Sequence, residues 1–456
     1  MKRHACGALL LACVACHGSG AERARLTTIR SCNYDVAFSG DGRARVTASC
    51  DADGPMAFRL AQAFLASSVR GPQRPKNLRF SSSDGRLSYA VDLAQLAEHQ
   101  RDFDRAAHIG ASFFAPMSNV LMVPEPLTTD LPVMVHVSAE APLAVSVGLA
   151  HDKSPDTYKL MAHEIPVATY FAFGKLEQRT LDVGGAKLEV TTLDGALDQS
   201  ADEVSAWIQS SANAVRDFYG AFPVPRASLT VLPIPERDSV LFGKVLPESE
   251  PGIALLLGQH APRKALYSDW ILVHELFHLG FPSFFEEGKW LDEGLATYYE
   301  PIIRVRAGLY SEQELWNEWE SSMPQGLPAF TGAGLEKADD FHGVYWGGAI
   351  ACLLADVTAR KRRLDAGLEV GLRALREAGG TASEVWSLNE VIGAVDHALG
   401  APTLAPVATA HAARGSAFDL QALFVELGVS RDASGAIQLS DAAPLSAIRH
   451  AITQKP

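Results

Sequence analysis

The apolar pattern of the sequence changes partway along the chain. From about Leu26 to Val190, short alternating or β-branched runs are separated by turn residues, which is the pattern of β-strands. From Tyr267 onward, apolar residues recur mainly at helical spacing. The chain has 456 residues, which is too many for one ordinary hydrophobic core. We therefore expect a multi-domain α+β protein with a β-rich N-terminal domain and a helical C-terminal region.

Individual segments can be assigned from the same patterns. Strands are expected at residues 78–82, 131–137, 144–149, 187–192, 227–232 and 253–257, with a long polar loop between the last two. An early helix is expected at residues 57–67. Later helices are expected at residues 199–218, 267–279, 289–306, 312–322, 344–359, 364–377, 388–399 and 404–414, followed by a hairpin and a short helix within 430–453.

The first residues have the composition of an export signal. Residues 1–4 are basic, and residues 8–15 form an apolar run that is too short to span a bilayer. Residues 10–13, Leu-Leu-Ala-Cys, resemble a bacterial lipobox, and Cys16 is a second candidate. We expect residues 1–16 to act as a lipoprotein signal, with Cys13 or Cys16 lipidated and the protein held in the bacterial cell envelope. The alternative is a plain secretory signal and a periplasmic or secreted protein.

The net charge and the cysteines narrow the class of protein. The formal net charge of -13 argues against a general nucleic-acid binder, because such a protein needs a basic face for phosphates. Cys32 and Cys50 lie on segments that flank the turn residues 39–42, so a hairpin would bring them together as a disulfide. Export to an oxidising compartment would permit that disulfide to form. Cys352 lies in an apolar run and is expected to be a buried thiol.

The strongest chemical signal is the segment Val-His-Glu-Leu-Phe-His-Leu at residues 273–279. On a helix, His274 and His278 lie one turn apart on the same face, so both imidazoles can reach one metal ion. Glu275 can sit beside a water on that metal, where a general base is needed. The segment therefore predicts a zinc site in which Glu275 activates the water.

A third ligand is needed, because catalytic zinc usually takes three protein ligands and leaves one position open. Glu293 lies fifteen residues after His278, at the start of an expected helix that can face the first one. Glu286 and Glu287 are rivals, but they lie in the preceding loop, where carboxylates are more often solvated. We therefore predict one zinc ion (Zn2+) per chain, bound by His274, His278 and Glu293.

These residues lie within a longer pattern. The His-Glu-x-x-His segment is followed at residues 290–298 by Trp-Leu-Asp-Glu-Gly-Leu-Ala-Thr-Tyr. This combination resembles the gluzincin metallopeptidases, particularly the alanyl and glycyl aminopeptidase families, which carry W-L-x-E-G-x-A-x-Y after the histidines. The resemblance implies a thermolysin-like zinc peptidase domain in which His274, His278 and Glu293 are zinc ligands and Glu275 is the general base.

Two further segments bear on the same resemblance. Residues 344–349, Val-Tyr-Trp-Gly-Gly-Ala, resemble the Y-x-x-G segment that opens a helix in those families. The resemblance implies that Tyr345 donates a hydrogen bond to the oxyanion, which suits a phenol that stays neutral at pH 7. Residues 252–258 do not contain the Gly-x-Met-Glu motif with which aminopeptidases hold the substrate's N-terminal amine. Removal of N-terminal residues and internal cleavage are therefore both open.

The resemblance also suggests a division of the chain and a function. The catalytic domain is expected at residues 196–360, between the β-rich domain at 26–195 and the helical region at 361–456. The implied function is hydrolysis of peptide bonds in a peptide or protein substrate. The alternative is a lipid-anchored protein that keeps the peptidase fold without turnover and acts as a binding or scaffold module.

Overall fold

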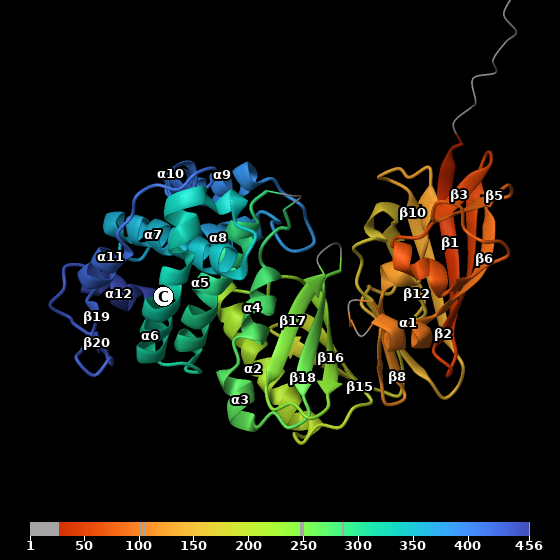
Figure 1. Ribbon diagram of the computed structural model, residues 1–456, viewed down its shortest axis with the longest axis horizontal. Coiled ribbons are helices and arrows are strands. Elements are labelled where there is room, and N and C mark those ends of the chain that lie inside the picture. The colour runs from red at the N-terminus through yellow and green to blue at the C-terminus, as the bar shows by residue number, and fades with distance from the viewer. Residues whose placement is uncertain (1–26, 101, 104, 247–249, 285–286, 456) are drawn as a thin grey trace, which may run out of the picture.

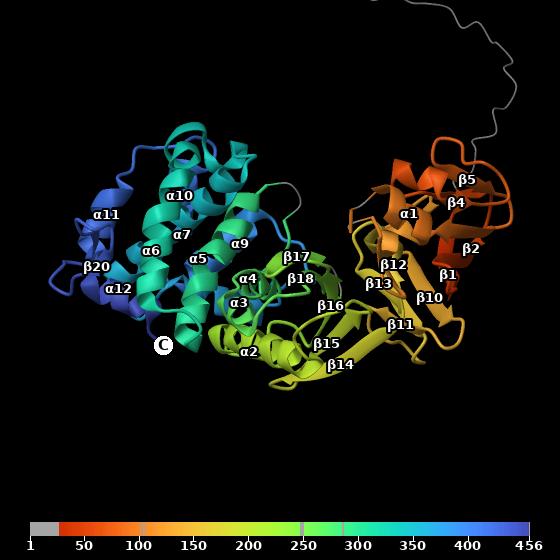
Figure 2. The same cartoon turned by 60° about the horizontal axis from the view of Figure 1, so that its bottom comes forward.

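The computed structural model describes residues 27–100, 102–103, 105–246, 250–284 and 287–455. Strands of the N-terminal domain lie at one end of the molecule, helices lie at the other end, and a five-stranded sheet lies between them (Figures 1 and 2). This arrangement confirms the predicted α+β class. The predicted export signal at residues 1–16 lies outside the described residues. Within the described ranges, none of the helices combines the length and hydropathy that a membrane crossing requires.

The N-terminal domain is built from three sheets. Six strands pair in the order β12 (Thr157–Met161), β10 (Pro132–Ala139), β1 (Ile29–Phe38), β2 (Arg43–Ala52), β6 (Arg86–Asp92) and β4 (Val69–Arg70). Four pair in the order β11 (Ala144–Val147), β13 (Tyr170–Gly174), β8 (Ser112–Pro116) and β7 (Ala107–Ile109). Three pair in the order β5 (Arg79–Ser82), β3 (Met56–Arg59) and β9 (Val123–Glu125). The domain also contains α1 (Leu93–Gln100) and the 3-10 turns η1 (Ala63–Ser67), η2 (Met117–Asn119) and η3 (Ala162–Glu164).

The alternation of buried and exposed side chains along the strands forms the core of this domain. In β1, Tyr34, Val36 and Phe38 are buried, and the residues between them face outward or are half-buried. The ring of Phe38 stacks on Phe173 of β13, with 4.2 Å between centroids. The six-stranded and four-stranded sheets therefore close on each other through their apolar faces.

Two predictions about this domain have different outcomes. The disulfide between Cys32 and Cys50 is confirmed, because β1 and β2 form a hairpin in which these two residues are direct partners. The helix predicted at residues 57–67 is wrong. This stretch contains the strand β3 and the turn η1, because β3 pairs with both β5 and β9 and buries Met56 and Phe58 on one face. Strand pairing outweighs the local helical spacing here.

The central sheet carries the candidate site. Its order is β14 (Leu176–Val183), β15 (Ala186–Leu193), β16 (Arg226–Ile234), β18 (Gly252–Gly258) and β17 (Val240–Leu246). The helix α2 (Ala201–Tyr219) connects β15 to its parallel neighbour β16 and begins with a capping box of Ser200 and Glu203. Although β14 and β15 lie within residues 26–195, they pair with this sheet rather than with the sheets of the N-terminal domain.

A small apolar cluster joins the central sheet to the N-terminal domain. Phe114 of β8 and Tyr170 of β13 pack there with Leu193, Leu232 and Ala254 of the central sheet. The two β-regions are therefore in direct contact.

The strand β17 corrects the sequence assignment between residues 232 and 253. That stretch was expected to be a polar loop, but residues Val240–Leu246 form an edge strand that pairs antiparallel with β18. Gly243 allows this strand to lie against the helix α4 (Ile271–His278), since a Cβ at Gly243 would lie 2.5 Å from Cγ of Glu275. The edge strand and the helix with the two histidines are therefore neighbours.

The rest of the chain is mainly helical. The helices are α3 (Arg263–Ser268), α4, α5 (Lys289–Ala307), α6 (Glu312–Ser322), α7 (Gly347–Arg362), α8 (Leu368–Glu377), α9 (Leu388–Ala398), α10 (Leu404–His411), α11 (Leu420–Leu427) and α12 (Ser446–Thr453). Between them lie the short turns η4 (Met323–Gly326), η5 (Ala329–Ala333), η6 (Leu335–Lys337) and η7 (His342–Trp346), and the hairpin β19 (Val429–Arg431) with β20 (Ile437–Leu439). The hairpin was predicted, whereas α11 was not.

The helix predicted at residues 267–279 is two helices. Asp269 has an extended backbone and ends α3. Its carboxylate accepts a hydrogen bond of 2.9 Å from the backbone N–H of Leu272 in the first turn of α4. This local bond satisfies an N–H group that the start of a helix leaves without a partner, so the chain can begin a new helix here. The break sets the direction of α4 and of its two histidines.

Candidate metal centre

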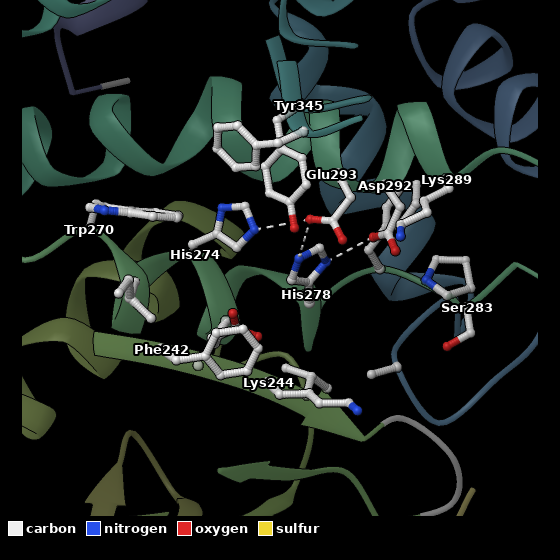
Figure 3. A pocket seen from close by; sticks show the side chains of 18 of the residues that line it. Phe242, Lys244, Trp270, His274, His278, Ser283, Lys289, Asp292, Glu293 and Tyr345 are labelled. Carbon is white, nitrogen blue, oxygen red and sulfur yellow. Dashed lines mark hydrogen bonds and ion pairs between the residues drawn. The ribbon is translucent and has the colours of Figure 1, made fainter. Parts of the chain in front are cut away.

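The helix α4 places His274 and His278 on the same face, as the spacing predicts. Their ring centroids lie 4.9 Å apart. His274 is 2% exposed, and His278 is half-buried. Both rings project toward the start of α5 (Figure 3).

Glu293 of α5 completes a three-residue cluster. One Oε2 atom of Glu293 lies 3.2 Å from Nε2 of His274 and 3.6 Å from Nε2 of His278. The ligand atoms of the three residues all lie within 4.8 Å of one another. Of the rivals, Glu287 is an exposed loop residue, and Glu286 lies outside the described residues. Among the described residues, the cluster predicted from sequence is the one whose atoms converge.

Asp292 fixes the orientation of one histidine. Its Oδ1 lies 2.8 Å from Nδ1 of His278. With the proton on Nδ1, the lone pair of Nε2 points into the cluster, which is the arrangement of histidine ligands supported by a carboxylate. No role of Asp292 was predicted from the sequence. Its position directly before Glu293 was the available signal.

The electrostatics of the cluster fit a cation. Burial alone would lower the pKa of His278, but the carboxylates of Asp292 and Glu293 outweigh it and raise the pKa well above its usual range. Burial alone would raise the pKa of Glu293, but its hydrogen bonds to His274 and His278 lower it. The site therefore draws positive charge, and two imidazole nitrogens with one carboxylate form a donor set that suits zinc.

Glu275 lines the same cavity without joining the cluster of ligand atoms. Burial raises the pKa of its carboxyl, and the imidazoles of His274 and His278 partly offset the shift. Its side chain lies between α4 and Gly243 of the edge strand β17. A carboxylate held beside a metal centre in this way can accept a proton from a nearby water.

Tyr345 approaches the cluster from the turn η7, which leads into α7. Its ring lies parallel to that of His274, with 5.7 Å between centroids. The hydroxyl points toward Glu293 (Figure 3). Burial and the nearby Glu293 carboxylate raise the pKa of Tyr345, so the phenol stays neutral and can donate a hydrogen bond.

Two glycines explain how Glu293 and Tyr345 come together. A Cβ atom on Gly294 of α5 would lie 2.5 Å from the Cα atom of Gly348 in α7. The two helices therefore touch through their backbones at this point, directly beside both functional residues. Their close contact requires glycine at both positions.

The five residues predicted from sequence surround one cavity of about 590 Å³. The cavity is bordered by α4, the start of α5, the turn η7 and the edge strand β17. This volume is within the usual range for sites that bind small molecules or parts of a peptide.

The fold has relatives among solved structures, whereas neither a protein-family model nor a curated protein matches the chain. An aminopeptidase N family protein from Idiomarina loihiensis is similar with a TM-score of 0.66 and 13% identity, covering 90% of this chain and 82% of that chain. An M1 zinc metallopeptidase from Deinococcus radiodurans is similar with a TM-score of 0.52 and 15% identity, covering 87% of this chain and 95% of that chain. The chain folds like an M1 zinc metallopeptidase.

The strand that borders the cavity carries no acidic residue that could hold a substrate amine. Residues 252–258, which lack the amine-binding motif, form β18, which lies second from the edge of the central sheet. The strand that borders the cavity is β17, and it contributes Leu241, Phe242, Gly243, Lys244 and Val245. None of these is acidic. The nearby Glu250 is bound to Arg226 at 3.2 Å, and Glu248 lies outside the described residues.

Proposed function

We propose that the chain is a zinc-dependent metallopeptidase that hydrolyses peptide bonds and holds one zinc ion. The observation that carries the proposal is the convergence of His274, His278 and Glu293 in a cavity that Glu275 and Tyr345 also line. The M1-type fold supports it. His274, His278 and Glu293 would hold the metal, and Asp292 would orient His278.

The residues of the cavity divide the chemistry between them. Zinc held by His274, His278 and Glu293 would supply Lewis acidity, which would lower the pKa of a water there to about 7 and polarise the carbonyl of the substrate. Glu275 accepts the proton of the attacking water and passes it to the nitrogen of the leaving amine. The neutral hydroxyl of Tyr345 donates a hydrogen bond to the carbonyl oxygen as negative charge develops there.

Metal analysis and a peptide library test the proposal. Protein purified without chelator should contain about one zinc per chain. Glu293→Ala should lose zinc, and Glu287→Ala, which changes an exposed carboxylate in the adjacent loop, should keep it. The wild type should cleave peptides from a mixed library, and including peptides with free and with blocked N-termini separates aminopeptidase from endopeptidase activity.

Different results would contradict the metal site and the peptidase activity. Wild-type protein without a transition metal, or Glu293→Ala that keeps both zinc and activity, would refute the proposed site. Zinc-loaded protein that cleaves no peptide would favour the alternative of a binding or scaffold protein with a peptidase fold.

We also propose that the protein is exported and held in the bacterial cell envelope by lipid on Cys13 or Cys16. The signal-like residues 1–16 motivate this proposal, and the disulfide between Cys32 and Cys50 supports an oxidising compartment. Intact-mass analysis of the mature protein should show a lipidated cysteine at the first position. An unmodified N-terminus beyond Cys16 would refute the lipid anchor while leaving export intact.

A further inference from the structure

Half of the large apolar side chains that the described chain exposes border the candidate metal centre. Eight such side chains are between 36% and 57% exposed, and four of the eight line the cavity: Leu241, Phe242, Trp270 and Phe341. The other four lie elsewhere: Leu127, Val167, Leu364 and Val425. Isolated exposed apolar residues are ordinary, whereas a group of them around a cavity is typical of a binding site.

Two of these rings contact the residues assigned to the chemistry. The ring of Phe341 stacks on Tyr345 with 4.4 Å between centroids, and Trp270 stands edge-on to His274 at 5.4 Å. A residue of extended chain spans at most about 3.6 Å. A substrate side chain that reaches these rings therefore belongs to a residue next to the cleaved bond.

The third ring, Phe242, lies on the edge strand β17. It is 44% exposed, and its ring contacts Phe103 of the N-terminal domain at 5.3 Å. The N-terminal domain therefore supports one wall of the cavity. Phe242 makes no ring contact with the ligands, so it can be changed without touching the metal centre.

The two sides of the cavity differ in polarity. Trp270 and Phe242 lie on the His274 side, whereas Lys289, Asp292 and Ser283 lie beyond His278 (Figure 3). Among the described lining residues, the carboxylates are those of Glu275, Asp292 and Glu293, all of which have roles at the metal centre. The lysines that line the cavity are Lys244 and Lys289. A positively charged substrate side chain on the aromatic side would therefore lose its hydration without gaining an opposite charge.

We propose that the protein selects peptides with a large apolar or aromatic side chain at one of the two residues that flank the cleaved bond, and that Phe242, Trp270 and Phe341 bind this side chain. The proposal rests on the proposed peptidase function and names its substrate class. Burial of the side chain removes apolar surface of both partners from water, and ring contacts add specific geometry.

Binding can be measured without turnover in the Glu275→Gln protein loaded with zinc. The probes are alanine-based hexapeptides with a single Phe, Leu or Lys at one of the first four positions, and the all-Ala hexapeptide. The first and second positions flank the bond that an aminopeptidase cleaves, and the third and fourth flank an internal bond. Calorimetry should give a Kd for one of the Phe peptides that is at least about ten-fold lower than for the all-Ala peptide, the usual size of apolar discrimination. The Lys peptides should bind no better than the all-Ala peptide, because the carboxylates of the cavity all have roles at the metal centre.

Variants of Phe242 then test whether its ring causes the preference for the Phe peptides. In the same background, Phe242→Ala should bring the ratio of the Kd of the all-Ala peptide to the Kd of the Phe peptide close to one. Phe242→Leu should retain most of the preference for the Phe peptide. The control is Val425→Ala, which removes an exposed apolar side chain of α11 and should leave the ratio unchanged. Zinc content should stay the same in all three, because neither Phe242 nor Val425 belongs to the cluster of ligand atoms.

Measurements on the wild-type protein with the same peptides distinguish the proposed aromatic selectivity from the proposed peptidase function. The kcat/KM ratio for Phe over Ala peptides should follow the binding ratio. Equal binding of all peptides, or a ratio unchanged by both Phe242→Ala and Trp270→Ala, would overturn the aromatic selectivity even if peptides are cleaved. Zinc-loaded wild type that cleaves none of them would overturn the peptidase function, whatever the binding ratio.

Discussion

The N-terminal domain and the metal-bearing region have interiors of different chemistry. Apart from Glu164, which is 9% exposed, the described N-terminal core buries polar groups that are neutral. Examples are the hydroxyls of Tyr34 and Tyr89, which donate to the backbone carbonyls of Met122 and Val120. The metal-bearing region buries full charges. Asp356, Arg360 and Glu369 are 0%, 4% and 2% exposed. One region is thus a conventional apolar core with a disulfide, and the other contains a buried ionic network.

This network connects the helices that carry the candidate site. Arg360 of α7 lies 2.8 Å from Asp356 of the same helix and 2.8 Å from Glu369 of α8. Tyr298 and Tyr299 of α5 donate to Asp356 and Glu369. Glu293 lies on α5 and Tyr345 directly before α7, so these bonds hold the two helices that deliver both residues. Buried ion pairs thus position the helices of the metal-bearing region, whereas apolar packing and the disulfide between Cys32 and Cys50 hold the N-terminal domain together.

The largest expected effect is on catalysis. Glu275→Gln should lower turnover by about a hundred- to ten-thousand-fold, because an amide cannot accept the proton of the water. Zinc content should stay at the wild-type value, since Glu275 is not among the ligand atoms that converge. Metal analysis and peptide hydrolysis, with Glu287→Gln as control, check this prediction. Loss of zinc in Glu275→Gln would contradict the assignment of base and ligands.

The buried network should be the more fragile of the two interiors. Arg360→Met should lower the free energy of unfolding by about 3–5 kcal/mol, because it removes the guanidinium that pairs with the buried carboxylate of Asp356 and leaves Glu369 with Arg306 as its ion-pair partner. The contrasting change is Arg43→Met in the N-terminal domain, which breaks surface ion pairs with Asp41 and Asp92, leaves no deeply buried charge behind and should cost about 1 kcal/mol or less. Urea unfolding measures both. Similar losses in the two variants would contradict the comparison.

Tyr345→Phe tests the catalytic role of the Tyr345 hydroxyl, because it removes only that group and keeps the ring. Loss of one hydrogen-bond donor to a developing oxyanion lowers turnover by about a hundred- to a thousand-fold. The ring packing on Phe341 and His274 should persist, so zinc content and melting temperature should not change. Steady-state kinetics and metal analysis are the measurements. Wild-type turnover in this variant would remove Tyr345 from the mechanism.

The disulfide should matter for stability and not for the metal. Replacing both Cys32 and Cys50 by Ala should lower the free energy of unfolding by about 3 kcal/mol, because the bond closes a loop with a sequence separation of 18 residues. Zinc content should not change. Thermal unfolding with and without reductant checks the effect, because reductant should shift the wild type and leave the double variant unchanged. A loss of zinc would show that the two regions are coupled.

The smallest expected effect concerns the support of one ligand. Asp292→Asn keeps an oxygen near Nδ1 of His278 but removes the negative charge, so zinc affinity should fall by about ten- to a hundred-fold. Competition with a chromogenic chelator measures the affinity. An unchanged affinity would mean that Asp292 holds His278 by position alone, without electrostatic support.

Several elements could be read from local patterns, and others could not. The helix α6 spans residues 312–322 as predicted, because Ser311 and Glu314 form a capping box at its start. The strand β17 was missed because its place at the sheet edge depends on pairing with β18, which no local period encodes. The early helix at 57–67 was wrong for the same reason, since β3 gains partners on both sides.

The sequence by itself determined the parts of the site that lie close together along the chain. His274 and His278 share a face because one helical turn separates them, and Cys32 meets Cys50 across a single hairpin. The need for a third ligand at the start of the next helix predicted Glu293, and the resemblance to a known family added Tyr345 as an expectation. Tertiary structure alone decided how these residues meet: the contact of Gly294 with Gly348, the bond of Asp292 to His278, and the aromatic wall of Phe242 and Trp270. Backbone hydrogen bonding repeats over a few residues and can be read locally, whereas packing joins residues far apart in the chain.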